Sequence, residues 1–247
     1  MSEIENISKA VIKRIAGLKQ KKNRDETGLF VAEGEKCINE LKEAFPIVHY
    51  LTPDNTPMRD LERLSSLRTP QGFIAVFKQP LYHLQQIDYK QLIVVLDGIQ
   101  DPGNMGTILR TCDWFGIQDV VCSAQTVDCF SQKVVQASMG ALAHVRVHYV
   151  PALTEYLNNV RLSHPDLPFY GTLLDGNNLY EQDAVAQKKK GLIIMGNEGN
   201  GITEEVRRQI THSLYIPSYS NNHIESLNVG IATAIILAYF RLKENEK

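Results

Sequence analysis

The stretch 92-LIVVLDGIQDPGNMGTILRTCDWFGIQDVVCS-123 decides the fold, because two apolar runs enclose a segment with helical periodicity. The runs 92–97 and 119–123 show no polar alternation, which is typical of strands buried on both faces. Between them, apolar residues recur every three or four positions, at Met105, Ile108, Leu109, Cys112 and Phe115. Gly116 follows, and glycine commonly ends a helix. We therefore expect a strand, a helix and a second strand parallel to the first.

The same alternation continues towards the C-terminus. Strand-like runs recur with helical patterns between them, at 92–97, 119–123, 145–150, 168–175, 191–196 and 213–217. Apolar strands that alternate with helices predict an α/β fold with a mostly parallel sheet covered on both faces. Ligands bind such sheets beyond the carboxyl ends of the strands, so the loops that follow the strands are where a site is expected.

Two changes in composition divide the chain. Residues 1–78 mix helix-like stretches with short strand candidates, and we expect a small N-terminal α/β domain there. Its strand candidates are 28–32, 47–50 and 72–77. Residues 79–91 are polar without a strong pattern, which indicates a linker. The domain with the parallel sheet then covers 92–247.

The composition is that of an ordinary globular protein. The chain has 247 residues, of which 43% are hydrophobic and 22% charged, so a sizeable core is expected. The N-terminus lacks an apolar signal region and the run 229–240 is too short to span a bilayer, which favours a cytoplasmic protein. The four cysteines lack metal-ligand spacing. His144 and His148 lie at an expected strand start, so no metal site is predicted.

A basic run lies near the N-terminus. Between Lys9 and Arg24 the chain holds seven basic residues and no acidic one. The seven are Lys9, Lys13, Arg14, Lys19, Lys21, Lys22 and Arg24. A solvated helix face is the common alternative for such lysines, but the absence of acidic residues within the run favours contacts with the phosphates of RNA.

The loop after the first strand of the parallel sheet carries a polar face. Asp101-Pro102-Gly103-Asn104 reads as a tight turn ahead of the helix. Asn104, Thr107, Arg110 and Thr111 share the face opposite the apolar residues. An N-cap asparagine and a solvated arginine would explain this face on its own. Beyond a strand end, however, the same face is where a ligand is expected.

The loop 196-GNEGNG-201 follows another buried run and precedes a helix start at Thr203. Three glycines in six residues allow a ligand to approach the backbone closely. The loop lacks the lysine of a P-loop and the spacing G-x-G-x-x-G, and Glu198 would repel a phosphate. A plain glycine-rich turn leaves the asparagines and Glu198 unexplained, so a cofactor without phosphate is favoured.

A third loop lies in 214-LYIPSYSNNHIESLNVGIATAIILAYF-240. A strand is expected to end at Ile216-Pro217, and Ser226 is expected to cap a helix that is apolar nearly all round. Such a helix must be buried in the core or at a subunit interface. Ser226 and Asn228 would then face the strand ends, next to the free amides of the helix start.

Together these motifs resemble a known family. N-x-G-x-x-x-R (104–110), G-N-E-x-x-G (196–201) and I-P…E-S-L-N-V (216–229) follow one another as in the SpoU, or TrmH-type, ribose 2′-O-methyltransferases of the SPOUT superfamily. Residues 92–242 resemble the catalytic domain, and residues 1–78 resemble a small ribosomal-protein-like substrate-binding domain. The resemblance implies S-adenosylmethionine-dependent methylation of a ribose in structured RNA. Ribosomal RNA is favoured because of the attached domain, and transfer RNA is the alternative.

The resemblance also implies a C-terminal trefoil knot that holds S-adenosylmethionine in a bent shape, and a homodimer. It implies contacts with this cofactor at Thr172, Leu173, Gly196, Asn197, Gly201, Ile216, Ser226 and Leu227. It implies an active site formed by Asn104, Arg110, Glu198, Ser226 and Asn228, with Arg110 acting from the partner subunit.

Arg110 is the residue on which the reaction is expected to depend. A guanidinium with a pKa above ~12 is a poor general base. We therefore expect Arg110 to grip the adjacent phosphate and to stabilise the developing alkoxide. Ser226, Asn228 and Asn104 would hold the ribose hydroxyl.

The chain departs from the family pattern twice. The usual I-P-M-x-G before E-S-L-N-V is replaced at 216–229 by a loop without that glycine, and Gly230 stands where the family often has serine. A non-catalytic RNA-binding protein is an alternative, but it would not need all five polar residues of the active site. A nucleotide-binding Rossmann enzyme would need a glycine-rich loop directly after the first strand, and 98–101 is not one.

Overall fold

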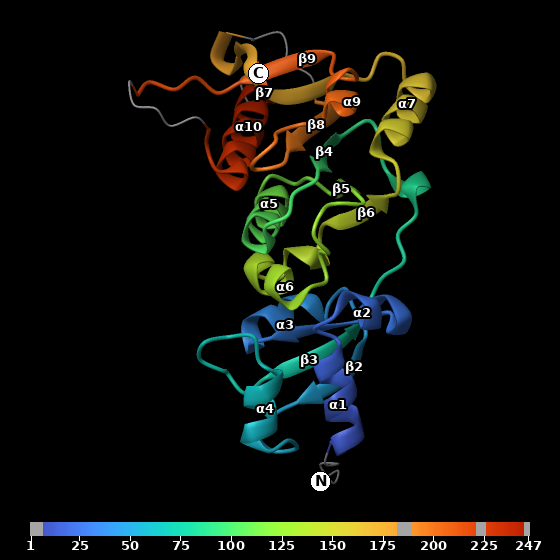
Figure 1. Cartoon of the computed structure of the whole chain (residues 1–247), viewed down its shortest axis with the longest axis vertical. Coiled ribbons are helices and arrows are strands. Elements are labelled where there is room, and N and C mark those ends of the chain that lie inside the picture. Colours follow the sequence, from blue (N-terminus) through green and yellow to red (C-terminus); the bar gives the residue numbers. More distant parts are fainter. Residues whose placement is uncertain (1–6, 182–188, 221–225, 245–247) are drawn as a thin grey trace. The chain divides into compact units, whose positions relative to one another are not determined.

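The computed structural model describes residues 7–181, 189–220 and 226–244 (Figure 1). The chain divides into two compact units. Unit 1 runs to Leu81 and also takes in Asp128–His144, which we call the inserted segment. Unit 2 comprises Tyr82–Val127 and the chain from Val145 onwards. The break after Leu81 falls within the stretch that the sequence marks as a linker.

Unit 1 is built on a three-stranded antiparallel sheet with the order β1-β3-β2 (Figure 1). Its first elements are α1 (Lys9–Gly17), α2 (Lys21–Thr27), β1 (Leu29–Glu33), α3 (Glu35–Leu41), β2 (Ile47–Leu51), α4 (Met58–Leu64) and β3 (Ile74–Lys78). Ile12 and Ile15 of α1 pack with Leu61 and Leu64 of α4 in one buried cluster, which also holds Val76 of the sheet. The expected small N-terminal α/β domain is confirmed, and its strands lie close to their predicted positions.

The inserted segment completes the core of unit 1. It contains α6 (Gln132–Ser138) and a short 3₁₀ turn, η2 (Ala141–Ala143). Helix α6 packs against β1, and the rings of Phe30 and Phe130 lie 4.8 Å apart. A part of the chain that follows the second strand of the parallel sheet therefore belongs physically to the N-terminal unit.

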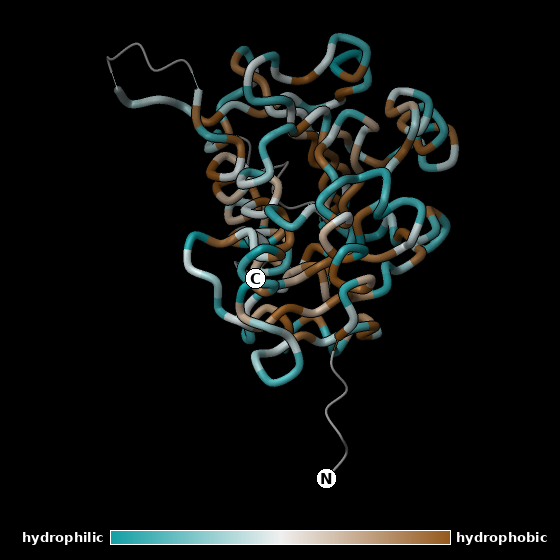
Figure 2. Tube along the Cα trace, turned by 60° about the horizontal axis from the view of Figure 1, so that its bottom comes forward, coloured by the Kyte–Doolittle hydropathy of each residue, from teal (hydrophilic) through white to brown (hydrophobic). Residues whose placement is uncertain are grey.

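Unit 2 contains a six-stranded sheet with the order β6-β5-β4-β8-β7-β9, and every pair in it is parallel. The strands are β4 (Leu92–Asp97), β5 (Asp119–Ser123), β6 (Arg146–Val150), β7 (Phe169–Asn178), β8 (Gly191–Gly196) and β9 (His212–Tyr215). The predicted parallel α/β sheet is confirmed, because β4, β5 and β8 have the predicted bounds and the others differ only at their ends. In Figure 2 hydrophobic colours mark much of the trace inside the molecule, whereas the outer loops are mostly hydrophilic.

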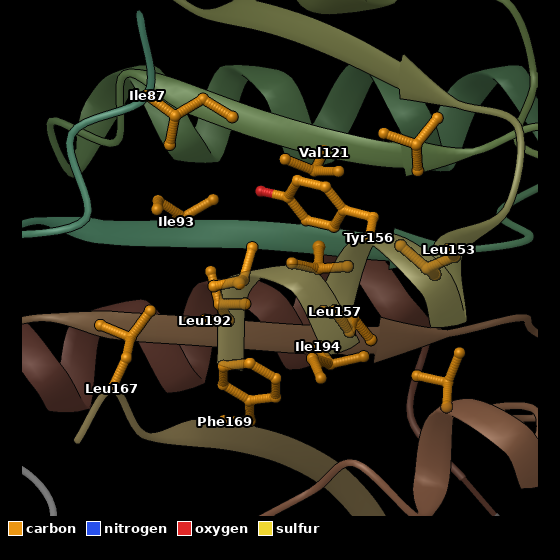
Figure 3. Packing of buried hydrophobic residues seen from close by; sticks show 14 of the residues in the cluster. Ile87, Ile93, Val121, Leu153, Tyr156, Leu157, Leu167, Phe169, Leu192 and Ile194 are labelled. Carbon is orange, nitrogen blue, oxygen red and sulfur yellow. The ribbon is translucent and has the colours of Figure 1, made fainter. Parts of the chain in front are cut away.

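The helices of unit 2 cover this sheet. They are η1 (Leu84–Gln86), α5 (Pro102–Trp114), α7 (Leu153–Ser163), η3 (Leu179–Glu181), α9 (Glu204–Arg207) and α10 (Val229–Glu244). On one face, Tyr156 and Leu157 of α7 pack onto Ile93, Val121 and Ile194 of three neighbouring strands (Figure 3). Helix α10 packs against α5. None of the helices within the described residues is long and apolar enough to cross a membrane.

Two helix starts differ from those that the sequence predicts. The stretch 101–104 is not a separate turn, because α5 already begins at Pro102 and the side chain of Asp101 caps it by accepting from the amide of Asn104. Helix α10 begins at Val229, and its cap is Asn228 rather than Ser226. The predicted stop of α5 is confirmed, since Gly116 adopts a φ of 66° just beyond the helix.

Candidate active site

The carboxyl ends of β4 and β8 lie side by side near the centre of the sheet. Asp97 and Gly196 are register partners at the ends of these two strands. The β4–α5 loop (98–101) follows Asp97, and the glycine loop (Gly196–Gly201) follows β8. Because β4 and β8 are neighbours in the sheet but far apart in sequence, this is the kind of position where parallel sheets bind ligands.

Hydrogen bonds fix the two loops to each other. The buried carboxylate of Asp97 accepts from both the amide and the hydroxyl of Thr203, each at 2.8 Å. The side-chain amide of Asn197 donates to the carbonyl of Gly98 at 2.6 Å. Both contacts reach from one strand end to the loop of the other, so the site is held by paired side chains rather than by backbone alone.

The glycine loop closes on itself. The backbone amides and carbonyls of Asn197 and Gly201 bond to each other at 2.9 Å, and Asn197 Oδ1 accepts from the amides of Gly199 and Asn200. A Cβ atom at position 196 would lie 2.2 Å from the carbonyl carbon of Gly201, so only glycine fits there. The asparagine that a plain glycine-rich turn leaves unexplained is therefore the residue that shapes the loop.

Three side chains from distant segments form a polar cluster, which we define as Asn104, Glu198 and Asn228. Asn104 Nδ2 donates to Glu198 Oε1 at 2.9 Å, and Asn228 Nδ2 donates to Asn104 Oδ1 at 2.7 Å. Asn228 Oδ1 also accepts from the amides of Gly230 and Ile231 at the start of α10. The structure thus brings together three of the five residues expected to form the active site.

Arg110 and Ser226 are outside the hydrogen bonds of the polar cluster. Arg110 is exposed on α5, and within the described residues its guanidinium has neither an ion pair nor a hydrogen bond. Ser226 is exposed two residues before Asn228, and its hydroxyl has no hydrogen bond to the described part of the chain. The donors of both side chains are therefore available to a substrate.

The residues expected to contact a cofactor lie at the same edge of the sheet. Thr172 of β7 donates its hydroxyl to the carbonyl of Ile194 in β8 at 3.2 Å, and Leu173 packs against the core of unit 2. Ile216 directly follows β9, and Leu227 is 48% exposed just before α10. Strands β8, β7 and β9 are adjacent, so these positions lie on or next to neighbouring strands of the sheet.

The surroundings of Gly230 explain why glycine, and not the serine common in the family, stands at this position. A Cβ atom at this position would lie 2.9 Å from Thr107 Cγ2 and 3.2 Å from Asn228 Oδ1. Helix α10 therefore approaches α5 closely next to the polar cluster, and a serine here would require Thr107 to shift. The loop before E-S-L-N-V that lacks the family's glycine lies partly at 221–225, outside the described residues.

The N-terminal basic run contains one residue that the sequence misassigns. Arg24 is buried, with 3% of its surface exposed, and its guanidinium is paired with Asp128 at 2.6 Å. It therefore has no surface to offer to RNA. Lys21 and Lys22 are exposed but pair with Asp25 and Glu26 one helical turn later, just beyond the run.

The other basic residues of the run are exposed. Lys19 donates its ammonium to the carbonyls of Arg63 and Ser65. Lys9, Lys13 and Arg14 lie on the solvent side of α1, without an acidic partner in the described part of the chain. Within the basic run, these three are the strongest candidates for contacts with an anion.

Sequence reasoning did not find two residues that hold the site, Asp97 and Thr203. The signal for Asp97 was present, because a carboxylate at the end of an otherwise apolar strand, buried in the sheet, needs a partner. The pairing with Thr203 could not be predicted, since 106 residues separate the two.

Two parts of the chain match known protein families. Residues 91–238 match the SpoU rRNA Methylase family, and residues 9–58 match the MRM3-like substrate binding domain. The chain belongs to the SpoU rRNA methylase family. The first match contains the glycine loop, Arg110 and the whole polar cluster, and the second contains the basic residues of α1 and α2.

Some relatives match this SpoU methylase over almost its whole length. The 23S rRNA (guanosine(2553)-2′-O)-methyltransferase RlmP of Bacillus subtilis is 30% identical over 98% of this chain and 100% of its own length. A TrmH-family protein from Porphyromonas gingivalis has a similar structure, with a TM-score of 0.86, 36% identity, and coverage of 96% of this chain and 99% of that one. The rRNA methyltransferase of Sinorhizobium meliloti with bound AdoMet has a TM-score of 0.83 at 27% identity, covering 96% of both chains.

Proposed function

We propose that this SpoU methylase transfers a methyl group from S-adenosylmethionine to the 2′-hydroxyl of a ribose in ribosomal RNA. The observation that carries the proposal is the polar cluster beside the glycine loop, where Asn104, Glu198 and Asn228 meet from three segments. The match to the rRNA methylase family and the names of the Bacillus and Sinorhizobium relatives support the reaction and the class of RNA.

The residues at the site fit S-adenosylmethionine. The glycine loop offers a backbone that closes tightly without side chains, and the exposed carboxylate of Glu198 beside it disfavours a phosphate and favours a cation. S-adenosylmethionine has no phosphate and carries a positive sulfonium, and it supplies an activated methyl group when bound. Gly196, Asn197, Gly201, Thr172, Leu173, Ile216, Ser226 and Leu227 are the residues that would hold it.

Arg110 supplies the positive charge that the reaction requires. The ribose oxygen gains negative charge as it loses its proton. A guanidinium without an ion pair or hydrogen bond among the described residues can stabilise that charge and hold the neighbouring phosphate. In this proposal Arg110 acts on the site of the partner subunit.

The polar cluster orients the ribose hydroxyl through the hydrogen-bonding groups that its side chains do not use among themselves. Asn228 uses Oδ1 for two amides of α10 and one of its N–H groups for Asn104, so its first task is to fix Asn104. Asn104 retains one N–H for the ribose hydroxyl, and the Ser226 hydroxyl, which has no hydrogen bond within the described part of the chain, can both donate and accept. Glu198 Oε2 is the nearby group that can accept a proton from the hydroxyl.

The wider assembly also follows from the proposal. The exposed residues Lys9, Lys13 and Arg14 of α1 bind the phosphates of the RNA, and Lys19, Lys21 and Lys22 add weaker contacts because they already have partners. The trefoil knot and the homodimer stay predictions from the family resemblance.

Arg110→Ala tests the catalytic role. We expect methyl transfer to total RNA from a strain lacking the gene to fall by about 10³-fold or more, with the dissociation constant of S-adenosylmethionine changed less than about twofold. Arg208→Ala is the matched control, because Arg208 is an exposed arginine of unit 2 that pairs with Glu204 at the surface. An Arg110→Ala enzyme that keeps its turnover, or that loses its cofactor affinity as well, would contradict the assigned role.

The same assay identifies the RNA. Radiolabelled S-adenosylmethionine is used to methylate RNA from the deletion strain, and the modified ribose is mapped. We expect the label in ribosomal RNA. Label confined to transfer RNA would support the alternative substrate, and absence of label with both RNAs would favour a non-catalytic RNA-binding protein.

A further inference from the structure

Arg24 and Asp128 form a buried ion pair in unit 1. The side chain of Arg24 is 4% exposed and that of Asp128 is 12% exposed. Arg24 Nε and Nη2 donate to Asp128 Oδ2 at 2.8 and 2.6 Å, while Nη1 donates to the carbonyls of Leu18 and Lys19. A buried guanidinium needs such full pairing, because an uncompensated charge inside a protein is costly. All of these partners belong to unit 1, so the guanidinium of Arg24 is fully occupied within the protein.

The ion pair is the first of several anchors that hold the inserted segment on unit 1. Two residues after Asp128, the ring of Phe130 packs on Phe30 of β1. Further along, Cys37 Sγ approaches the carbonyl of Val135 at 3.9 Å. The start of the segment is therefore fixed by charge, and its middle by packing.

The residue before Asp128 is fixed in unit 2. The amide of Val127 donates to the carbonyl of Ile99 in the β4–α5 loop at 2.8 Å, and the carbonyl of Val127 accepts from the hydroxyl of Tyr149 at 2.6 Å. Ser123 Oγ accepts from the amide of Gly98 in the same loop. The β4–α5 loop leads directly into α5, which carries Asn104 and Arg110. Since one peptide bond joins Val127 to Asp128, a restraint on Asp128 also restrains the residue that holds this loop.

We propose that Arg24 and Asp128 are positioning residues for methyl transfer. Their buried ion pair fixes the start of the inserted segment and, through Val127 and Ile99, holds the β4–α5 loop in the conformation that places the first turn of α5. This inference rests on the proposed function, and it assigns to Arg24 a role other than contact with RNA. Small errors in the placement of catalytic groups slow a reaction strongly, so the effect should appear in turnover more than in binding.

Asp128→Asn is the decisive variant. Asparagine keeps the size of the side chain and an Oδ1 acceptor for the amide of Phe130, but it removes the charge that faces Arg24. We expect single-turnover methyl transfer at saturating S-adenosylmethionine and RNA to fall about tenfold, while the KM for RNA and the dissociation constant of the cofactor change less than about twofold. Asp128→Glu, which keeps the charge, should recover part of the loss.

Hydrogen exchange provides a readout that does not depend on activity. In full-length Asp128→Asn protein, amides of the peptide 98–104 should exchange about fivefold faster or more than in the wild type, although the substitution lies outside this peptide. Asp25→Asn is the matched control, because it removes the carboxylate of an exposed ion pair on the same helix as Arg24. The control should change neither turnover nor exchange at 98–104.

The possible failures are distinguishable. The inference would be overturned if Asp128→Asn kept the turnover of the wild type. It would also be overturned if turnover fell only in proportion to the amount of folded protein, with unchanged exchange at 98–104. If wild-type protein methylates no RNA, the proposed function fails, but the comparison of exchange rates between the variants still decides whether the ion pair restrains the loop.

Discussion

Gly196 has no space for a side chain, and this single position limits the shape of the whole glycine loop. A Cβ atom there would meet the backbone of Gly201 and Ile202 at 2.2–2.3 Å, and backbone cannot move aside as a flexible side chain can. At Gly199, three residues later, the nearest atom to an added Cβ is Asn197 Oδ1 at 3.5 Å. Two glycines of one loop therefore have very different tolerance to the same substitution.

We expect Gly196→Ala to weaken the binding of S-adenosylmethionine about tenfold or more. The glycine loop would have to open to make room for the side chain of the alanine. Gly199→Ala should bind the cofactor within about twofold of the wild type, since ordinary van der Waals contact suffices there. Isothermal titration calorimetry on both variants measures the two constants. Equal affinity in Gly196→Ala and the wild type would show that the loop does not contact the cofactor.

At the level of residues, the sequence predicted polar side chains that the structure brings together, but not the hydrogen bonds between them. Asn104, Glu198 and Asn228 stand out because polar residues follow strand ends and precede a helix. Arg24 was misassigned because a run of basic residues looks continuous in sequence, and nothing near it indicates that Asp128, 104 residues away, neutralises it. Long-range pairing of this kind follows from the fold and cannot be derived from local spacing.

At the level of elements, β5 and β6 are joined by a side-chain network as well as by their backbone. Asp119 accepts two hydrogen bonds from Arg146 at 2.8 and 2.7 Å and one from His148 at 2.9 Å. Burial alone would raise the pKa of Asp119, but the hydrogen bonds from His148 and Arg146 outweigh it and hold the pKa below its usual value. The carboxylate is therefore stabilised in the folded state.

This network predicts a dependence of stability on pH. A carboxyl with a lowered pKa in the folded state contributes stability above its unfolded pKa of ~3.9, and the contribution is lost as the pH falls towards the folded value. Asp119→Asn should therefore lower the free energy of unfolding at pH 7 by about 1–3 kcal/mol. The difference from the wild type should begin to shrink as the pH falls below about 3.9, because the carboxyl then takes up a proton in the unfolded state before it does so in the folded state.

Urea denaturation at pH 7 and near pH 3.5 measures this difference. Asp175→Asn is a useful comparison, because a hydrogen bond from Arg207 also lowers the pKa of Asp175, but this carboxylate is exposed and screened by solvent. Its substitution should change stability less at either pH. A difference for Asp119→Asn that is constant across the range would exclude the ionic contribution.

The elements themselves were predictable for a clear physical reason. Strands β4, β5 and β8 are buried along their whole length and mostly apolar because both faces are covered, so their bounds are visible in the sequence. The end of β7 and the starts of α5 and α10 were less accurate, because hydrogen bonds of Asp101 and Asn228 decide where those helices begin. Several neighbouring polar residues can each cap a helix, and the composition of the segment does not show which of them does so.

At the level of the whole molecule, α10 has an apolar face that unit 2 does not bury completely. Ile231 is 53% exposed and Leu242 is 66% exposed, and Ile235 and Ala238 between them are partly buried on the same side of the helix. Trp114 at the end of α5, the helix that packs against α10, is 84% exposed. Apolar side chains exposed in this way support the proposed homodimer.

We expect Ile231→Glu to shift the protein from dimer to monomer, because a charge in a dimer interface loses its hydration without gaining a partner. Sedimentation equilibrium from about 1 to 50 μM gives the association constant, which should fall by about tenfold or more. Leu162→Glu is the control, since Leu162 is 80% exposed on α7, a helix that lies apart from α5 and α10 in Figure 1. If wild-type protein is monomeric over this range, Arg110 must act within its own chain.

The inserted segment has a consequence for the ancestry of this chain. If a gene for the N-terminal unit were transplanted to another enzyme with a border at Leu81, the product would lack the aromatic ring that covers Phe30 and the carboxylate that neutralises Arg24. The segments before and after Leu81 therefore cannot be exchanged independently of each other, so recombination at Leu81 should be selected against. Substitutions at Arg24 and Asp128 should accordingly be found together, or not at all, among descendants of the same ancestor.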